Sequence, residues 1–427
     1  MIVADFRINK SVWISIYYLL LLLLLVSRPE GAAAPNMVIR IAYMTLLMVP
    51  GFFIKNTWLP SVMICFITVA QYGFSYSYLP SGVEYYTYPL FLGLFFYKSK
   101  ELRFKLPKAY YFLILLFFFV ELIASERIGT TFWGALVALL IANYIENNKD
   151  AEDKLSWAFI VASFTLSLLY ILFRDKFLVD YSSSSGLERA DWIDPNYFSM
   201  AIGMGAIVAL SRIYGKDVTL IYKVFLASTV ALSFFSIVLL ASRGGLLSFS
   251  IASLTIILFS KGNRFVKFLV TVSIVAFTIF LFNSHYFDLV IYRIENDAGG
   301  GSGRLDIWLS KLQAWGTSGF LETLFGCGLT KGTSISGTMI GFHNDFIAML
   351  VEYGIVGFCV FISLWLFPIW NIIKYKRNVV RVMAFMLFIT VECCTLEPLT
   401  LGRIPFWMFF IYIIFISNRC RYEKKDM

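Results

Sequence analysis

Charged residues are scarce in this chain of 427 residues, in which Asp, Glu, Lys and Arg together make up 15%. An ordinary soluble domain carries about 25% charged and about 45–50% apolar residues, whereas the apolar share here is 59%. A soluble fold of this size could not bury so much apolar surface, which excludes a water-soluble globular enzyme. The same apolar excess excludes an intrinsically disordered chain.

Residues that bind transition metals are also few, because the chain has two histidines and six cysteines. The cysteines show no spacing typical of metal ligands, and most of them lie in apolar runs, where free thiols are commonly packed in the interior. Zinc sites draw mainly on cysteine and histidine. We therefore expect neither a metal site nor a cofactor.

Long apolar runs, in contrast, are abundant. A transmembrane helix needs about 20 apolar residues to cross the ~30 Å hydrocarbon core, and fourteen segments are candidates. They are 11–27, 37–54, 59–79, 83–97, 109–124, 131–145, 155–173, 196–211, 219–241, 244–260, 266–283, 344–370, 379–396 and 404–418. The sequence therefore predicts an all-α polytopic membrane protein with about 12–14 transmembrane helices. The first segment is interpreted as a retained anchor, because no clear cleavage site follows it.

One of the apolar runs is too long to be a single span. From Val224 to Ser260 the chain has 37 residues with a single charge, Arg243. As one straight helix this run would be ~55 Å long, nearly twice the thickness of the hydrocarbon core. The chain must fold back, and Arg243-Gly244-Gly245 offers the break. Arg243 is therefore expected at a membrane surface, at the tip of a tight hairpin.

The distribution of Lys and Arg predicts the orientation of the spans. Of the 36 basic residues, 24 fall in one set of loops, which includes both termini, and 12 fall on the opposite face. Basic residues are concentrated in the cytoplasmic loops of membrane proteins, so both termini are expected to be cytoplasmic. This distribution accounts for the net charge of +9, and no nucleic-acid partner is expected.

The outward face has two substantial loops, at about 174–195 and 284–343. Long connections in an otherwise short-looped bundle are more often functional than decorative. The chain thus divides into transmembrane helices at 1–283, an outward loop at 284–343, and transmembrane helices with a cytoplasmic tail at 344–427. Apolar residues at helical spacing predict an amphipathic helix at 305–316, lying in the membrane interface.

Three residues on the outward face have side chains suited to chemistry on a phosphorylated substrate. Arg243 stands at the hairpin break, and Arg304 follows a glycine-rich approach at the start of the amphipathic helix. Helix N-termini attract anions, and arginine adds a bidentate clamp. His343 stands where the long loop re-enters the membrane. The helix dipole at that point favours a neutral imidazole, which can accept a proton.

Each of these residues also has an interpretation without a function. Arg243 could extend its side chain to lipid headgroups, Arg304 could be a solvated charge, and His343 could be an ordinary loop residue. Four acidic residues in or near the spans are open between a functional role and interhelical hydrogen bonds: Glu121, Glu352, Glu392 and Glu397. The argument for a site depends on the conjunction of the three residues on one face.

The motifs around these residues resemble those of the O-antigen ligase/O-antigen polymerase superfamily of bacterial envelope glycosyltransferases. The matching segments are Asp194–Asn196, Ser242–Gly245, Gly303–Leu305, Leu324–Leu329, His343–Phe346, Glu352–Gly357 and Arg403–Pro405. They cover about residues 190–410. The resemblance implies a GT-C-like, multi-pass protein of the bacterial cytoplasmic (inner) membrane, with its active site facing the periplasm or exterior.

The resemblance also implies an activity and its residues. By motif position, the essential arginines of the superfamily fall on Arg243 and Arg304, and its essential histidine falls on His343. Arg189, Asn344 and Arg403 are expected to bind substrate. The implied reaction is an inverting, metal-independent transfer of an oligosaccharide from undecaprenyl pyrophosphate to a sugar hydroxyl. The implied partners are this lipid-linked donor, an acceptor glycan or lipid A-core, the lipid bilayer and a chain-length regulator.

The candidate transferase activities differ in the acceptor that receives the glycan. Short loops together with Ser-Arg-Gly-Gly and His-Asn-Asp favour an O-antigen or surface-polysaccharide polymerase, which extends another lipid-linked repeat unit. The alternative is an O-antigen ligase that transfers to lipid A-core, and an oligosaccharyltransferase acting on protein is a third. A flippase or other transporter would instead place charged residues along a path near the bilayer midplane.

Overall fold

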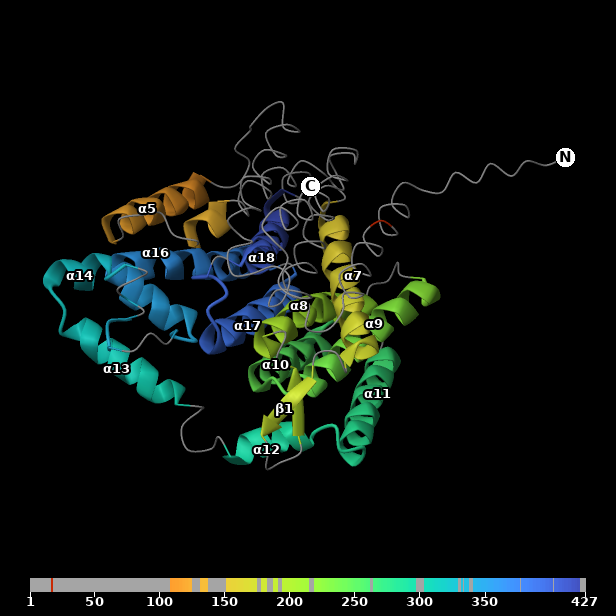
Figure 1. Cartoon of the computed structure of the whole chain (residues 1–427). Helices are drawn as coiled ribbons and strands as arrows, with labels where there is room; N and C mark the ends of the chain where they lie inside the picture. Colours follow the sequence, from red (N-terminus) through yellow and green to blue (C-terminus); the bar gives the residue numbers. More distant parts are fainter. Residues whose placement is uncertain are drawn as a thin grey trace.

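The apolar runs of the sequence form helices in the computed structural model of the chain (Figure 1). The structure describes Tyr17 and a series of longer segments: 108–124, 131–136, 151–174, 178–182, 187–190, 194–214, 219–261, 264–296, 303–328, 332, 334–337, 341–376, 378–401 and 403–422. Apart from Tyr17, the first four expected spans lie outside the described residues. The total of about 12–14 spans therefore stays a prediction.

The described helices begin and end close to the expected boundaries. They are α5 (Lys108–Ala124), α7 (Ala151–Leu172), α8 (Pro195–Ile213), α9 (Leu220–Leu239), α10 (Arg243–Phe259), α11 (Arg264–Asn283), α12 (Asp288–Asn296), α13 (Arg304–Gly316), α14 (Phe320–Phe325), α16 (Asp345–Tyr375), α17 (Val379–Thr395) and α18 (Ile404–Tyr422). A short antiparallel hairpin lies within the first outward loop, with β1 (Leu178–Ser182) paired to β2 (Leu187–Ala190). This hairpin is the one sheet among the described residues.

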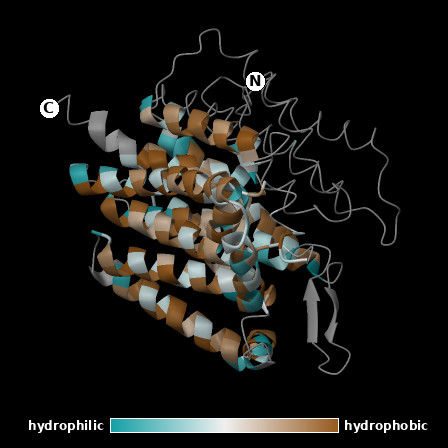
Figure 2. Ribbon diagram, turned by 90° about the vertical axis from the view of Figure 1, so that its left-hand side faces the viewer, coloured by the Kyte–Doolittle hydropathy of each residue, from teal (hydrophilic) through white to brown (hydrophobic). Residues whose placement is uncertain are grey.

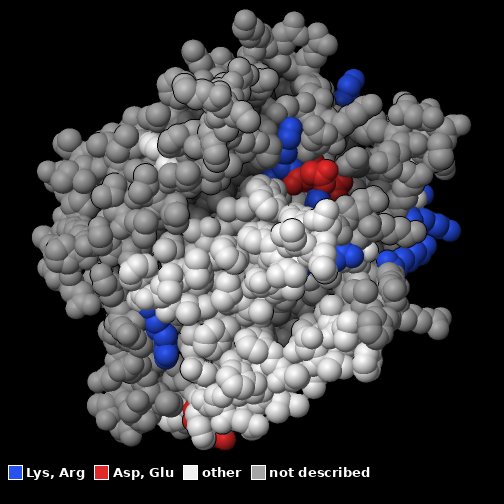
Figure 3. Space-filling view, turned by 90° about the vertical axis from the view of Figure 1, so that its right-hand side faces the viewer, with Lys and Arg blue, Asp and Glu red and all other residues white. Residues whose placement is uncertain are grey.

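Several of these helices are suited to a membrane. Four of them, α7, α8, α9 and α16, are long and apolar enough to span one, and α11 with α12 adds a fifth if the pair, bent by 77°, is one span. Most of the ribbon of the described helices has the colour of apolar residues (Figure 2), and many large apolar side chains of α5, α9, α10 and α11 are exposed. Figure 3 shows a patch of uncharged residues on the described part of one face, with charged residues at its edges. The chain is therefore an all-α, multi-pass membrane protein, as the composition predicts.

The expected hairpin break at Arg243 is confirmed. Helix α9 ends at Leu239 and α10 begins at Arg243. Between them Ala241 has a φ of 49°, in the left-handed region. Ser242 caps α10, because its hydroxyl accepts a hydrogen bond of 3.2 Å from the backbone N–H of Gly245. Arg243 is therefore the first residue of helix α10, directly after the turn.

Helix α16 differs from the single span expected at 344–370, because it is broken at Gly354. This residue has φ 67° and ψ −172°, so the helix divides into a section before the glycine and a longer one after it. The backbone N–H groups of Cys327 and Gly328 each donate a hydrogen bond of 3.0 Å, to the carbonyls of Val351 and Glu352 respectively. The segment around Gly326 thus supplies partners for carbonyls that the break leaves without helical ones.

The two chain segments at this break are too close for side chains. A Cβ atom on Gly354 would overlap the carbonyl of Leu324, and one on Gly326 would overlap the carbonyl of Glu352. Both glycines also have positive φ values, of 67° and 92°. Hydropathy does not reveal such a break, since Glu352 is the only charged residue between Asp345 and Lys374 and the run around Gly354 is otherwise mostly apolar.

We expect Gly354→Ala to destabilise the fold by about 2–4 kcal/mol, because it combines an unfavourable φ with a backbone overlap. Thermal unfolding in detergent measures the effect. Gly316→Ala is the matched control, since a Cβ there meets no atom within 4 Å. Equal melting temperatures for the two variants would contradict the tight packing at this break.

The predicted amphipathic helix is confirmed as α13, although its apolar residues divide between two directions. Leu312 and Trp315 pack against a small cluster around the buried Phe342. Leu305 and Leu309 instead are 52% and 58% exposed. Lys311 is buried, with its ammonium nitrogen 4.5 Å from the centre of the Phe342 ring. Helix α13 is thereby fixed against the segment that leads to His343.

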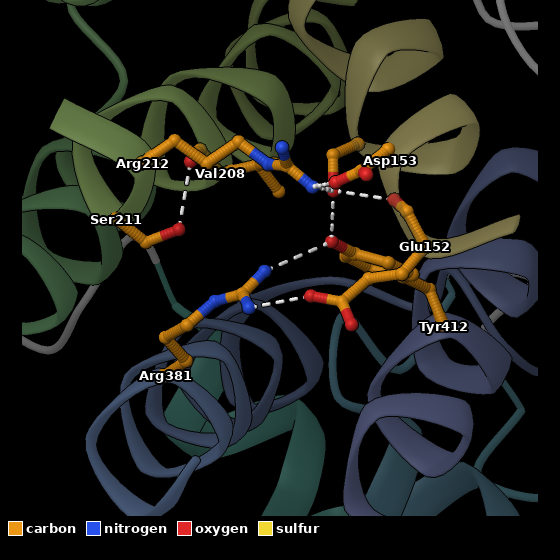
Figure 4. A network of polar contacts seen from close by, with 8 residues as sticks. Glu152, Asp153, Val208, Ser211, Arg212, Arg381 and Tyr412 are labelled. Atoms are coloured by element: carbon orange, nitrogen blue, oxygen red, sulfur yellow. Dashed lines mark hydrogen bonds and ion pairs between the residues drawn. The ribbon is translucent and has the colours of Figure 1, made fainter. Parts of the chain in front are cut away.

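Helix α8 lies at the centre of the described bundle, and polar residues gather at each of its two ends. Its neighbours are α7, α9, α10 and α17. At its C-terminal end Arg212 forms an ion pair of 2.5 Å with Asp153 of α7 (Figure 4). Beside it Arg381 of α17 forms an ion pair of 2.6 Å with Glu152. Arg212 and Arg381 thus share the end of the bundle away from Asp194. The sequence places both among the 24 basic residues of the loops expected to be cytoplasmic.

Candidate active site

A pocket lies at the other end of the bundle, where four helix ends meet. It is partly open and is lined by Asn196, Ser242, Arg243, Gly244, Gly245, Arg293, Arg304, Glu392, Thr395 and Leu396. These residues come from the N-terminal ends of α8, α10 and α13, from α12, and from the C-terminal end of α17. Two of the three residues expected to be catalytic, Arg243 and Arg304, therefore face one cavity.

Two glycines allow the helix ends to come together. A Cβ atom on Gly244 would lie 2.8 Å from the hydroxyl oxygen of Thr395, and one on Gly245 would overlap the hydroxyl of Ser199. Helix α10 can therefore approach α17 on one side and α8 on the other. The Ser242 hydroxyl also donates a hydrogen bond of 3.2 Å to the side-chain oxygen of Asn196. The glycine pair accordingly sets the position of Arg243 in the pocket.

The arginines of the pocket are held by main-chain carbonyl oxygens. Arg243 donates to the carbonyl of Arg293 at 3.2 Å, and Arg293 in turn donates to the carbonyl of Ala241. Arg304 donates to the carbonyl of Thr395 at 3.0 Å. Burial lowers the pKa of Arg304 from its ordinary value, and the charges of Arg243 and Arg293 lower it further. Three cations thus repel one another around one cavity, and an anion bound there would relieve this repulsion.

His343 lies close enough to Arg304 for their charges to interact, although it is not among the residues that line the pocket. Its backbone has a φ of 51°, and it directly precedes Asn344, the N-cap of α16. Burial lowers the pKa of the imidazole, the charge of Arg304 lowers it further, and the charge of Asp194 opposes both effects. Both lowering effects favour the neutral imidazole, the form that the sequence predicts for a base.

The three residues expected to bind substrate lie in different settings. Arg189 belongs to β2 and pairs with Val179. The side-chain oxygen of Asn344 accepts hydrogen bonds from Phe346 and Ile347, so this residue acts as a helix cap. The guanidinium carbon of Arg403 lies 5.2 Å from the centre of the Tyr197 ring, next to the N-terminal end of α8. Their roles in binding substrate stay predictions.

The structure also places the four acidic residues whose roles the sequence leaves undecided. Glu121 accepts a hydrogen bond of 3.2 Å from the hydroxyl of Tyr353, and Glu392 accepts one from Ser248, so both link helices. Glu392 in addition lines the pocket. Glu352 is buried in the section of α16 before the break.

Glu397 lies in the loop between α17 and α18 and accepts a hydrogen bond from the backbone N–H of His343. Burial raises the pKa of the Glu397 carboxyl to about 7, the charge of Asp345 contributes to the increase, and the hydrogen bond from His343 opposes it.

Sequence analysis did not identify Arg293 as part of the site. It belongs to α12, within the long outward loop, eleven positions before Arg304. Its side chain is 8% exposed, which is unusual for an arginine without a structural or functional role. The available signal was the amphipathic pattern of residues 288–296, which indicates a helix.

The described part of the chain thus defines an all-α membrane protein with an arginine-lined pocket at one end of its helices. Residues 228–362 match the family model described as O-antigen ligase. This segment contains Arg243, Arg293, Arg304 and His343, and it confirms the resemblance to the O-antigen ligase/polymerase superfamily. The match indicates a glycosyltransferase-like membrane enzyme. No curated protein matches the chain.

Proposed function

We propose that the protein transfers a glycan from undecaprenyl pyrophosphate to a sugar hydroxyl of an acceptor outside the cytoplasmic membrane. The observation that carries this proposal is the convergence of Arg243, Arg293 and Arg304 on one pocket, with His343 close to Arg304. All four residues lie in the segment that matches the O-antigen ligase family. The acceptor we favour is another lipid-linked repeat unit, which makes the protein an O-antigen or surface-polysaccharide polymerase.

The arginines suit the leaving group of this reaction. When the bond between sugar C1 and the pyrophosphate oxygen breaks, negative charge builds on the departing pyrophosphate. Guanidinium groups bind phosphate oxygens through two parallel hydrogen bonds. Groups that are already in place when the charge develops lower the barrier most effectively. The pocket offers three such groups at helix ends, so the proposed chemistry requires no metal ion.

His343 supplies the second requirement, which is a base for the acceptor. The acceptor hydroxyl oxygen bonds to C1 while the neutral imidazole takes up the hydroxyl proton. Attack from the side opposite the pyrophosphate inverts the configuration at C1. The lowered pKa of His343 keeps the imidazole available as a base at neutral pH.

The same chemistry, with arginines at the leaving group and His343 as the base, serves a ligase that transfers to lipid A-core. The description of the matching family as O-antigen ligase favours this second candidate. A flippase is less well supported, because Arg243 and Arg304 each lie in the first turn of a helix rather than within a span. In either transferase we place the pocket on the periplasmic or exterior side and both termini in the cytoplasm. A chain-length regulator would be a partner of the polymerase.

One incubation distinguishes the candidates. Purified protein is mixed with synthetic undecaprenyl-pyrophosphate repeat units, with and without lipid A-core, and the products are separated on a gel. A ladder without core supports the polymerase, whereas product that requires core supports the ligase. If correctly folded protein forms no product in either mixture, the proposed transfer is wrong.

A further inference from the structure

The segment that carries His343 is bound by a carboxylate from another part of the chain. Glu397 accepts hydrogen bonds from the backbone N–H groups of His343 and Phe342. The carboxylate also lies against Gly341, where a Cβ atom would be 3.1 Å from one of its oxygens. Glu397 is 8% exposed. Its contacts with the segment that leads to His343 are thus made with the main chain.

His343 needs such a contact, because its backbone conformation is unfavourable. A φ of 51° lies in the left-handed region, which residues other than glycine adopt uncommonly, although asparagine, aspartate and histidine do so more often than the rest. Conformations of this kind cost about 1–3 kcal/mol and persist where the surroundings hold them. Hydrogen bonds that adjacent N–H groups donate to a carboxylate are charge-assisted and therefore strong. Glu397 has the chemistry to hold His343 in this conformation.

Glu397 is itself fixed by its neighbours. The carboxylate of Asp345 accepts hydrogen bonds from the backbone N–H groups of Leu399 and Thr400, at 3.0 and 2.9 Å, and so orders the loop that follows α17. The backbone N–H of Glu397 donates at 3.3 Å to the hydroxyl of Tyr197, near the start of α8. The carboxylate therefore belongs to a frame that joins α8, α16 and α17 at the pocket end.

We propose that Glu397 is a positioning residue, which holds the main chain of residues 342–343 so that the His343 imidazole stays beside Arg304. Its consequence for catalysis depends on the proposed function, whereas the geometry does not. Removing the carboxylate releases the left-handed backbone of His343. The imidazole then moves away from Arg304 toward solvent.

The composition of the chain allows this to be tested without an activity measurement. His285 and His343 are the two histidines of the chain. In a His285→Asn background, which suits the φ of 62° at position 285, His343 is the single imidazole. The charges that shift its pKa belong to Arg304 and Asp194. A change on substitution of Glu397 thus reports a displacement of the ring.

The experiment follows the His343 imidazole by NMR in detergent-solubilised protein labelled with 13C-histidine. We expect Glu397→Ala to raise the pKa of His343 toward its ordinary value and to increase its rate of modification by diethyl pyrocarbonate severalfold. Glu397→Gln is the isosteric variant if the alanine variant does not fold, and it should shift both readouts in the same direction but less. An unchanged titration and unchanged reactivity in a folded variant would overturn the proposal.

A second carboxylate serves as the control. Glu322 accepts a backbone hydrogen bond of 3.2 Å from Gly319 at the start of α14, so Glu322→Gln removes a contact of the same kind elsewhere. It should leave the His343 titration unchanged. In the transfer assay, Glu397→Gln should lower kcat with little change in KM, and Glu397→Asp should recover part of the loss. If wild-type protein shows no transfer, the proposed function fails while the NMR result still decides the positioning role.

Discussion

Arg304→Ala is expected to lower the rate of glycan transfer by about 10²–10³-fold, the usual cost of removing one preorganised group that stabilises charge in a transition state. The side chain is anchored to the carbonyl of Thr395 and faces the pocket together with Arg243 and Arg293. An alanine leaves the helix start intact, because the N-cap of α13 is Gly303 and makes no side-chain hydrogen bond. The loss should therefore appear in kcat rather than in the amount of folded protein.

Two further variants make this result specific. Arg304→Lys keeps the charge but loses the planar fork, so its rate should lie between those of the wild type and the alanine variant. Lys267→Ala removes a half-buried cation near the start of α11, which donates to the carbonyl of Leu258 and does not line the pocket, and should leave the rate unchanged. The readout is the initial rate of product formation with a synthetic lipid-linked donor. A wild-type rate in Arg304→Ala would remove this residue from the site.

Arg293 extends the same argument to a residue that has no place in the sequence motifs. Because it donates to the turn carbonyl of Ala241 and its own carbonyl accepts from Arg243, it connects the α9–α10 hairpin to α12. Long outward loops are usually interpreted as irregular, so a helix of nine residues within one is easily missed. Hydropathy and motif order therefore predict Arg243 and Arg304, but not the third arginine between them.

The fold, too, has one break that the sequence predicts and one that it does not. The break at Arg243 is predictable, because an uninterrupted run of 37 residues exceeds the thickness of a membrane. The break at Gly354 is not predictable, because Glu352 is the only charge in the long apolar run around it. The carbonyls that the break frees find partners in Cys327 and Gly328, more than twenty residues away in sequence. At the site, the role of Glu397 could not be predicted from the sequence either. Nothing in its local sequence indicates that its carboxylate binds the main chain of His343.

His343→Ala is expected to lower the rate of transfer by about 10²–10⁴-fold, the range for loss of a general base. His285→Asn is the matched control, since His285 is exposed and pairs with Asp288 at 3.1 Å, and it should retain the wild-type rate.

The wild-type rate should fall on the acidic side as the imidazole becomes protonated, at a pH below the ordinary histidine value of about 6.5, because burial and the charge of Arg304 lower the pKa of His343. Arg304→Ala removes one of these causes, so the acidic limb of its residual activity should move to higher pH. A limb that stays in place, with full activity in His343→Ala, would assign the base to another residue.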